Sequence, residues 1–274
     1  MSDGNIQRVG SLDDPRVGPY RNLKDRDLAK EGDRFIAEGL LVTSRLLRSG
    51  SHCCESVLSA EKRLDAVRPL VPADVPIYVV PDALVHAIVG YKFHSGVMSV
   101  GIRPSSPRLE QVVPVSGRCV LSVCPKTAST DNLGSLVRIS AAFGCDAMLL
   151  GEECCDPYYR QSIRVSMGAV FALPMVRSDD IRRDLRTLRE RLGVVLLATV
   201  LDEDAEPLDV LPELPRVAVL FGNESAGLGR DLVDLCDRRV TIPMRQGVDS
   251  LNVAVSAGVF LYELTRDRGM AARG

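Results

Sequence analysis

The sequence predicts an α/β protein in which a small N-terminal α/β domain precedes a larger domain built on a parallel sheet. A chain of 274 residues is long enough for two domains. From Cys119 onwards, short strand-like runs alternate with helical patterns, and this alternation favours parallel strands covered by helices on both faces. The Pro- and Ser-containing stretch Arg103–Pro107 breaks the composition between the two parts and is the best candidate for a boundary.

The N-terminal part begins with a polar stretch, residues 1–17, which we expect to be loose. From Pro19 to about Arg48, apolar residues recur at helix-like intervals and predict a helical region. Its basic residues form either a solvated charged face or a face that contacts phosphate groups, and both interpretations remain open. These residues are Arg21, Lys24, Arg26, Lys30 and Arg34. The remaining elements are an apolar run at Ser56–Leu58, helices over Lys62–Val67 and Asp82–Val89, and strands over Ile77–Val80 and Gly96–Val100.

The second part alternates strands and helices in the order expected of a parallel sheet. The strands are expected over Cys119–Val123, Ala147–Leu150, Val194–Val200, Val217–Phe221 and Val240–Ile242. The helices are expected over Leu133–Phe143, Arg164–Ala169, Asp179–Arg191, Gly229–Leu235 and Val253–Arg266.

Composition excludes several classes of protein. No run approaches the roughly 18 apolar residues of a membrane span, and the N-terminus lacks the basic and apolar regions of a signal peptide. We therefore expect a soluble, cytoplasmic protein. The eight cysteines include no C-x-x-C spacing and the three histidines complete no zinc pattern, so buried free thiols and no metal are expected. A net charge of −2 means that any RNA binding must use local patches.

Polar loops follow two of the expected strands in the last third of the chain. Val217–Phe221 and Val240–Ile242 each stop at a loop that carries glycine or proline. In an open α/β sheet, ligands bind in the crevice beyond the carboxyl ends of the strands. The sequence therefore predicts a small-molecule site formed by these two loops.

Two familiar nucleotide-binding motifs are absent from that site. Residues 222–229 have the glycine spacing of a P-loop, but Leu228 and Gly229 stand where lysine and serine or threonine are required. No G-x-G-x-x-G fingerprint follows the first strand of the second part. These observations argue against a nucleoside triphosphatase and against a dinucleotide-binding enzyme.

Taken singly, the polar residues of these loops have structural interpretations as well as functional ones. Arg138 fits a surface salt bridge, and Glu224 fits a carboxylate placed favourably near a helix N-terminus. Ser250 and Asn252 precede the last expected helix and fit helix N-caps. Spacing alone leaves both kinds of interpretation open.

Three polar segments follow expected strands in the second part of the chain. They are Asn132-x-Gly134-x-x-x-Arg138, Leu220-Phe221-Gly222-Asn223-Glu224-x-x-Gly227-Leu228, and Ile242-Pro243-Met244 with Ser250-Leu251-Asn252-Val253-Ala254. Together they resemble the motifs of the TrmH/SpoU branch of the SPOUT RNA methyltransferases. Their order and separations match the family over about residues 118–265, although Thr130-Asp131 stands where the family usually has Asp-Pro. Residues 19–101 are similar, less closely, to the L30e-like RNA-binding domain that often precedes this catalytic domain.

The resemblance implies a fold and an activity. It implies an L30e-like substrate-binding domain over residues 1–105, a linker over 106–117, and a SPOUT catalytic domain with a C-terminal trefoil knot over 118–274. The expected reaction transfers a methyl group from S-adenosylmethionine to a ribose 2′-hydroxyl of structured RNA, either tRNA or rRNA. The expected enzyme is a homodimer that uses no metal and no membrane.

The resemblance also assigns roles to residues. The catalytic set carried over from the family is Arg138, Asn132, Glu224, Ser250 and Asn252. The cofactor-binding set is Leu220, Gly222, Ile242, Met244 and Leu251. Because a guanidinium stays protonated, we expect Arg138 to stabilise the developing alkoxide and to hold the adjacent phosphate, while the proton passes to phosphate or water.

Two other functions compete with this prediction. A protein of the same fold can bind RNA or cofactor without turnover, and the intact Arg138, Glu224 and Asn252 argue against it. A nucleotide-dependent oxidoreductase of the doubly wound type is the other, and the missing glycine fingerprint argues against that one.

Overall fold

The computed structural model describes residues 3–21, 33–90, 93–202, 204–245 and 250–266. The chain divides into two compact units, the first made of residues 1–105 and 157–172 and the second of residues 106–156 and 173–274. The segment 157–172 therefore belongs to the N-terminal unit, whereas the sequence placed it in the second domain. Among the described residues, no helix is long and apolar enough to cross a lipid bilayer.

The first unit is organised on a mixed sheet of five strands in the order β1-β4-β3-β5-β2. Strand β4 pairs in parallel with β1 and β3, and β5 pairs antiparallel with β3 and β2. The strands are β1 (Ile6–Arg8), β2 (Arg34–Glu38), β3 (Cys53–Ala60), β4 (Ile77–Val80) and β5 (Val97–Ile102). The helices are α2 (Leu40–Leu47), α3 (Leu64–Val67), α4 (Asp82–Val89) and α7 (Arg160–Val165).

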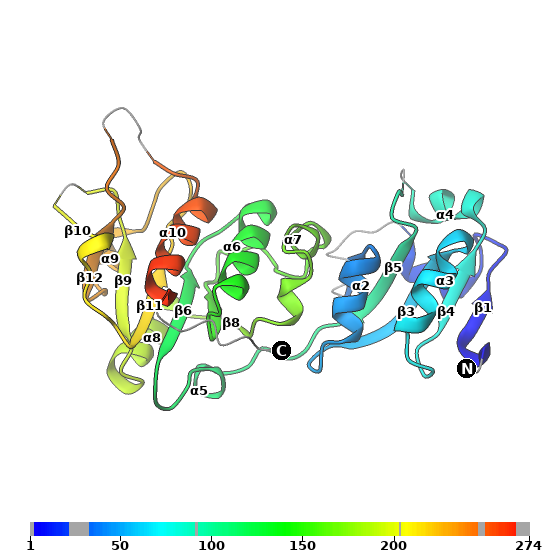
Figure 1. Ribbon diagram of the computed structural model, residues 1–274, viewed down its shortest axis with the longest axis horizontal. Coiled ribbons are helices and arrows are strands. Elements are labelled where there is room, and N and C mark those ends of the chain that lie inside the picture. The colour runs from blue at the N-terminus through cyan, green and yellow to red at the C-terminus, as the bar shows by residue number, and fades with distance from the viewer. Residues whose placement is uncertain (1–2, 22–32, 91–92, 203, 246–249, 267–274) are drawn as a thin grey trace. The chain divides into compact units, whose positions relative to one another are not determined.

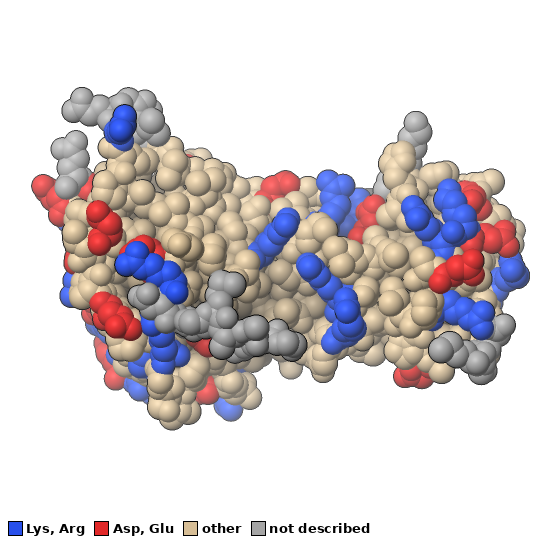
Figure 2. All heavy atoms as spheres, in the orientation of Figure 1, with Lys and Arg blue, Asp and Glu red and all other residues tan. Residues whose placement is uncertain are grey.

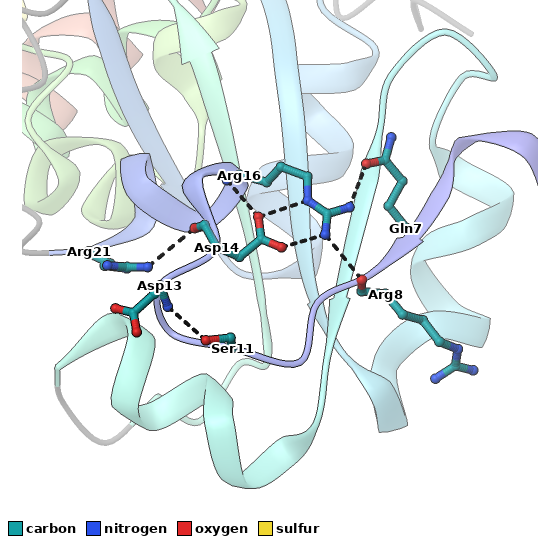
Figure 3. Close-up of polar contacts among 7 residues, drawn as sticks. All are labelled: Gln7, Arg8, Ser11, Asp13, Asp14, Arg16 and Arg21. Carbon is teal, nitrogen blue, oxygen red and sulfur yellow. Dashed lines mark hydrogen bonds and ion pairs between the residues drawn. The ribbon is translucent and has the colours of Figure 1, made fainter.

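Residues 3–17 are ordered, contrary to the expectation that the stretch 1–17 is loose. Strand β1 extends the sheet, and Val17 and Tyr20 are fully buried beyond it. Figure 3 shows the polar contacts that hold this stretch: the Arg16 guanidinium donates to Asp14 at 2.9 Å and to Gln7 at 3.0 Å. The Arg16 hydrogen bonds hold the pKa of the Asp14 carboxyl at about 2. The polar composition predicted a loose stretch, but the polar side chains hydrogen-bond to one another and hold the stretch in place.

The helix expected from Pro19 to Arg48 is also wrong in part, because Arg34–Glu38 forms strand β2. Phe35, Ile36 and Ala37 are all buried, so both faces of this short strand are covered. A short apolar run of this kind does not distinguish a buried strand from a buried helix. Residues 22–32, which carry Lys24, Arg26 and Lys30, lie outside the described residues.

The second unit contains a parallel sheet of seven strands in the order β10-β12-β9-β11-β6-β7-β8. Its strands are β6 (Cys119–Cys124), β7 (Ala147–Leu150), β8 (Met175–Arg177), β9 (Val195–Thr199), β10 (Glu206–Pro207), β11 (Arg216–Leu220) and β12 (Arg238–Thr241). Its helices are α5 (Leu109–Val112), α6 (Thr130–Ala142), α8 (Ile181–Arg186), α9 (Arg230–Val233) and α10 (Val253–Thr265). The predicted parallel sheet is confirmed, with the short edge strands β8 and β10 as additions.

Helices cover both faces of this sheet, as alternate side chains of β6 show. Leu121 and Val123 belong to the core that includes Leu185 of α8. Ser122 points to the other face, where Ser140 of α6 donates a hydrogen bond to it at 2.9 Å. Helix α10 packs against α6 on that second face (Figure 1). Helices α6 and α10 thus begin together at the edge where the strands end.

Residues 106–117 differ from the expected linker. They contain the short helix α5, and Leu109 and Val113 are buried in the core of the second unit. Burial of these apolar side chains makes the segment a part of the fold of that unit.

Candidate active site

A cavity of about 500 Å³ lies at the carboxyl edge of β9, β11 and β12. The residues that follow these three strands form its walls, and the beginning of α10 closes one side. The lining residues after the strands are Thr199, Val200, Leu201, the run 221–227, Ile242 and Met244; those of the α10 side are Ser250, Leu251, Asn252, Val253, Ser256 and Phe260. The cavity therefore occupies the crevice that a parallel sheet leaves for ligands.

The loop after β11 turns back on itself at two glycines. A Cβ on Gly222 would lie 2.5 Å from the carbonyl carbon of Gly227, so only glycine permits this close approach. Gly227 has a positive φ of 65°, and it exchanges backbone hydrogen bonds of 3.0 and 2.8 Å with Asn223. The Asn223 side chain also accepts from the backbone N–H of Ser225 at 3.0 Å. This tight turn lifts Glu224 to the rim of the cavity.

Three polar side chains from the three sequence motifs meet at that rim. The Asn132 side-chain amide donates to the Glu224 carboxylate. The Asn252 side-chain amide nitrogen donates to the side-chain oxygen Oδ1 of Asn132 at 3.2 Å. We call these three residues the rim triad. They are 92 and 120 residues apart in sequence, so the fold alone brings them together.

Helix caps hold two members of the rim triad in place. The Ser129 hydroxyl accepts from the backbone N–H of Asn132 at 3.3 Å and caps α6. The side-chain oxygen Oδ1 of Asn252 accepts from the backbone N–H of Ala254 at 2.9 Å and caps α10. Asn252 therefore fills both of the roles that the sequence left open, since its oxygen caps the helix and its nitrogen joins the triad.

The cavity includes most of the residues expected to bind a cofactor. Gly222, Ile242, Met244 and Leu251 line it. Leu220 does not, because its side chain is fully buried in the core and its carbonyl oxygen accepts from the Thr199 hydroxyl at 2.8 Å. Ser250 also lines the cavity, on the same side as Asn252.

Two further walls of the cavity were not predicted from the sequence. The end of β9 contributes Thr199 and Leu201, and the aromatic rings of Phe221 and Phe260 contribute from β11 and α10. The two rings meet edge to face with centroids 6.2 Å apart. The position of β9 between β12 and β11 was the missing information, because strand order is not visible in the sequence.

Arg138 lies apart from the cavity. It is exposed on α6, and its side chain has neither a hydrogen bond nor an ion pair among the described residues. Six residues of helix rotate a side chain by about 240°, so Arg138 shares its face with Asp131 and Ser135 rather than with Asn132. The described residues therefore supply no salt bridge for this arginine.

The thiols near the cavity are neutral. Cys124 ends strand β6, and burial raises the pKa of its thiol well above the ordinary value. Burial likewise raises the pKa of Cys155 to about 11. Because the thiolate is the nucleophilic form, neither cysteine acts as a nucleophile at neutral pH. Among the described residues, no group of three His, Cys, Asp or Glu side chains is arranged to hold a metal ion.

Comparison with known proteins places this site in a family. The model of the SpoU rRNA Methylase family matches residues 120–262, which include the whole rim triad. An uncharacterized tRNA/rRNA methyltransferase of Mycobacterium tuberculosis is 35% identical over 273 residues, covering 96% of this chain and 92% of the relative. The 23S rRNA (guanosine(2553)-2′-O)-methyltransferase RlmP of Bacillus subtilis is 24% identical over 94% of this chain and 99% of its own.

Solved structures agree with these relatives. The AdoMet-bound rRNA methyltransferase of Sinorhizobium meliloti superposes with a TM-score of 0.81 at 25% identity, covering 96% of this chain and 98% of its own. The SpoU methyltransferase AviRb of Streptomyces viridochromogenes, in complex with AdoMet, superposes with a TM-score of 0.77 at 26% identity, covering 93% and 99%. The family match and the near full-length similarity lead to one conclusion: the chain belongs to the SpoU rRNA methylase family.

Proposed function

We propose that the protein is an S-adenosylmethionine-dependent methyltransferase that modifies a ribose 2′-hydroxyl of tRNA or rRNA. Membership of the family supports RNA methylation, and relatives named as 2′-O-methyltransferases support the ribose hydroxyl as the acceptor. The observation that carries the proposal is the rim triad, which joins all three motifs at the opening of one cavity.

The cavity suits S-adenosylmethionine in size and chemistry. Its volume of about 500 Å³ lies within the range of small-molecule sites. Ile242, Leu251 and Phe260 offer apolar surface for a flat adenine ring, and Gly222 exposes backbone on the opposite wall. When bound, the cofactor supplies an electrophilic methyl group on a positively charged sulfur.

The rim triad orients the groups around that methyl. Glu224 places a negative charge at the opening of the cavity, and opposite charges attract most strongly where water is partly excluded. Asn132 holds this carboxylate, and Asn252 holds Asn132. Ser250 lies beside Asn252 and offers a hydroxyl to the ribose. We assign to these four residues the positioning of cofactor and substrate.

Arg138 acts on the acceptor oxygen in this proposal. Its guanidinium remains charged and can donate two parallel hydrogen bonds, one to the developing alkoxide and one to the neighbouring phosphate. The proton of the hydroxyl passes to phosphate or water. Arg138 is not among the described residues that line the cavity of its own chain, so in this proposal a second copy of the chain brings it to the reaction.

An exposed apolar stripe supports a homodimer. Val255, Val259 and Tyr262 recur at helical spacing on α10, with 53%, 40% and 58% of their surface exposed. The Tyr262 ring contacts Phe143, which follows α6, edge to face at 6.1 Å. Helices α6 and α10 therefore form one surface, and a second copy packed on it covers the stripe and receives Arg138 at the interface.

The roles of the two domains and the cellular location are also part of the proposal. We assign substrate binding to the L30e-like N-terminal domain over residues 1–105 and catalysis to residues 118–274, with the trefoil knot at their C-terminal end. A cytoplasmic location is supported by eight cysteines that form no disulfide, as expected in a reducing compartment.

Methyl transfer to RNA tests the proposal directly. The purified protein is incubated with methyl-labelled S-adenosylmethionine and deproteinised tRNA or rRNA, and the labelled nucleotides are mapped. We expect label on one ribose 2′-oxygen. Binding of cofactor and RNA without transfer would favour the non-catalytic alternative, and label on a base would contradict the assigned acceptor. The oxidoreductase alternative is excluded by the family.

A further inference from the structure

Two segments of the first unit run side by side with a constant offset of 122 residues. Arg160 faces Glu38 at 4.0 Å, the Arg45 guanidinium donates to the Met167 carbonyl at 2.5 Å, and the Ser49 hydroxyl donates to the Phe171 carbonyl at 3.1 Å. Residues 160–171 thus run parallel to residues 38–49, with α7 packed on β2 and the turn after α7 in contact with α2. This register joins a segment inside the family match to the N-terminal unit.

An aromatic cluster fixes the two segments beneath this contact. Phe35 of β2 stacks on Phe171 with ring centroids 5.5 Å apart and meets Tyr158 at 5.1 Å. The Tyr158 hydroxyl and His52 Nε2 share a hydrogen bond of 2.9 Å. Burial lowers the pKa of His52 to about 4, so the ring is neutral at pH 7. These contacts pack residues 38–49 and 157–172 into one surface, which we call the platform.

The charges on this platform are almost all positive. Residues 38–49 and 157–172 contain four arginines and one acidic residue, whereas the whole chain has a net charge of −2. Arg45, Arg48 and Arg164 are exposed. None of these three forms an ion pair with a carboxylate among the described residues. Figure 2 shows basic side chains over the region where Figure 1 places α2 and α7, with few acidic ones between them.

The arginine-rich stretch at α8 provides a contrast. Arg182 pairs with Asp231, Arg183 pairs with Asp184, and Arg189 pairs with Glu190. Those guanidinium groups are already neutralised by nearby carboxylates. On the α2 and α7 surface, by contrast, Arg45, Arg48 and Arg164 have no carboxylate partner among the described residues, whereas Arg160 faces Glu38.

We propose that Arg45, Arg48 and Arg164, the α2–α7 arginine surface, bind the phosphate backbone of the RNA substrate. The guanidinium fork matches two phosphate oxygens, and phosphate contacts fix the position of an RNA without reading its sequence. The inference rests on the proposed function, and it adds that α7 completes the RNA-binding surface of the N-terminal unit. Residues 1–105 alone therefore lack the part of this surface that Arg164 contributes.

Arg48 and Arg164 provide the cleanest test. Arg48 bonds only to the Ser44 carbonyl of its own helix, and Arg164 has no side-chain bond among the described residues, so alanine disturbs little structure. Each full-length variant, Arg48→Ala and Arg164→Ala, is titrated with bulk tRNA and with total rRNA at several salt concentrations. We expect each change to raise the RNA Kd about two- to fivefold. The slope of log Kd against log salt should become shallower by about 0.7 to 0.9 per contact.

Arg186→Ala is the matched control, because Arg186 is an exposed arginine of α8 without an ion pair among the described residues. It should leave both the RNA Kd and the salt slope as in wild type. An unchanged slope in Arg48→Ala and Arg164→Ala, or an equal change in Arg186→Ala, would overturn the inference. Methylation by wild type is measured in parallel, since a wild-type protein that binds RNA through this surface but transfers no methyl group would contradict only the proposed function.

Discussion

The side-chain amide of Asn132 donates a hydrogen bond to the carboxylate of Glu224, which lies 92 residues further along the chain. This bond joins the first turn of α6 to the loop after β11 at the rim of the cavity. A third motif is connected through Asn252, whose oxygen caps α10. A change at any of the three residues should therefore affect the position of the other two.

The first prediction concerns charge within the rim triad. Asn132→Asp removes the donor and places a second carboxylate against Glu224. Like charges in contact raise the pKa of one carboxyl, so the pair repels at pH 8 and one member is protonated as the pH falls. We expect kcat/KM relative to wild type to be roughly tenfold lower at pH 8 and to recover partly at pH 5.5. For Asn132→Ala, kcat/KM relative to wild type should not depend on pH. An equal pH dependence in both variants would contradict the contact between Asn132 and Glu224.

Arg138→Lys should remove most turnover while cofactor binding persists. Lysine keeps the positive charge but loses the planar fork that can hold alkoxide and phosphate together. Loss of one charge-stabilising donor costs about 10²–10³ in kcat in other enzymes. Single-turnover methylation and calorimetric cofactor binding separate the two effects. Near-normal single-turnover rates in Arg138→Lys would remove this arginine from the mechanism.

Gly222→Ala should damage the cofactor site. The new Cβ would lie 2.5 Å from the Gly227 carbonyl carbon and 2.7 Å from the Leu228 nitrogen, both of which are backbone atoms. The loop must shift, so we expect the cofactor Kd to rise by at least about tenfold, the equivalent of about 1.4 kcal/mol. Gly258→Ala is the control, because no atom lies within 4 Å of a Cβ there and alanine favours a helix. Equal cofactor affinity in both variants would show that the loop accepts a side chain.

Tyr262→Glu should dissociate the proposed homodimer. A charge placed in a covered apolar interface loses its hydration without gaining a partner, which costs about 3–5 kcal/mol. Light scattering should show a monomer at concentrations where the wild type is a dimer. Val115→Glu tests the effect of charge alone, since Val115 is 97% exposed in the second unit and lies outside α6 and α10. Methylation should fall in Tyr262→Glu and persist in Val115→Glu; an active monomer would contradict a shared site.

A fragment of residues 106–274 tests the division into units. Because residues 1–105 resemble a substrate-binding domain, we expect their deletion to weaken RNA binding and to leave cofactor affinity nearly intact. The structure adds that Tyr158 and Phe171 lose the ring of Phe35 on which they pack. We expect the fragment to bind a hydrophobic dye more strongly than the full chain does. Replacing both rings with serine in the fragment should lower dye binding again, and weak dye binding by the unmodified fragment would show that the segment finds another partner.

The sequence by itself determined the parallel sheet of the second unit and the motifs around the cavity. Strands such as β7 and β11 are buried β-branched or apolar runs between helical patterns, and this alternation is a local property of the chain. The motif residues Gly222, Ile242 and Asn252 were found because their types and separations are also written in the sequence.

Tertiary structure decided the rest, because the deciding contacts are distant in sequence. Strand β1 exists because β4, about 70 residues away, supplies its hydrogen-bond partners. Phe35 lies in a strand rather than a helix because both faces of β2 are covered. Segment 157–172 belongs to the first unit because Phe171 stacks on Phe35. Arg138 is turned away from Asn132 by the pitch of α6, and only the fold shows that this arginine is not among the described residues that line the cavity.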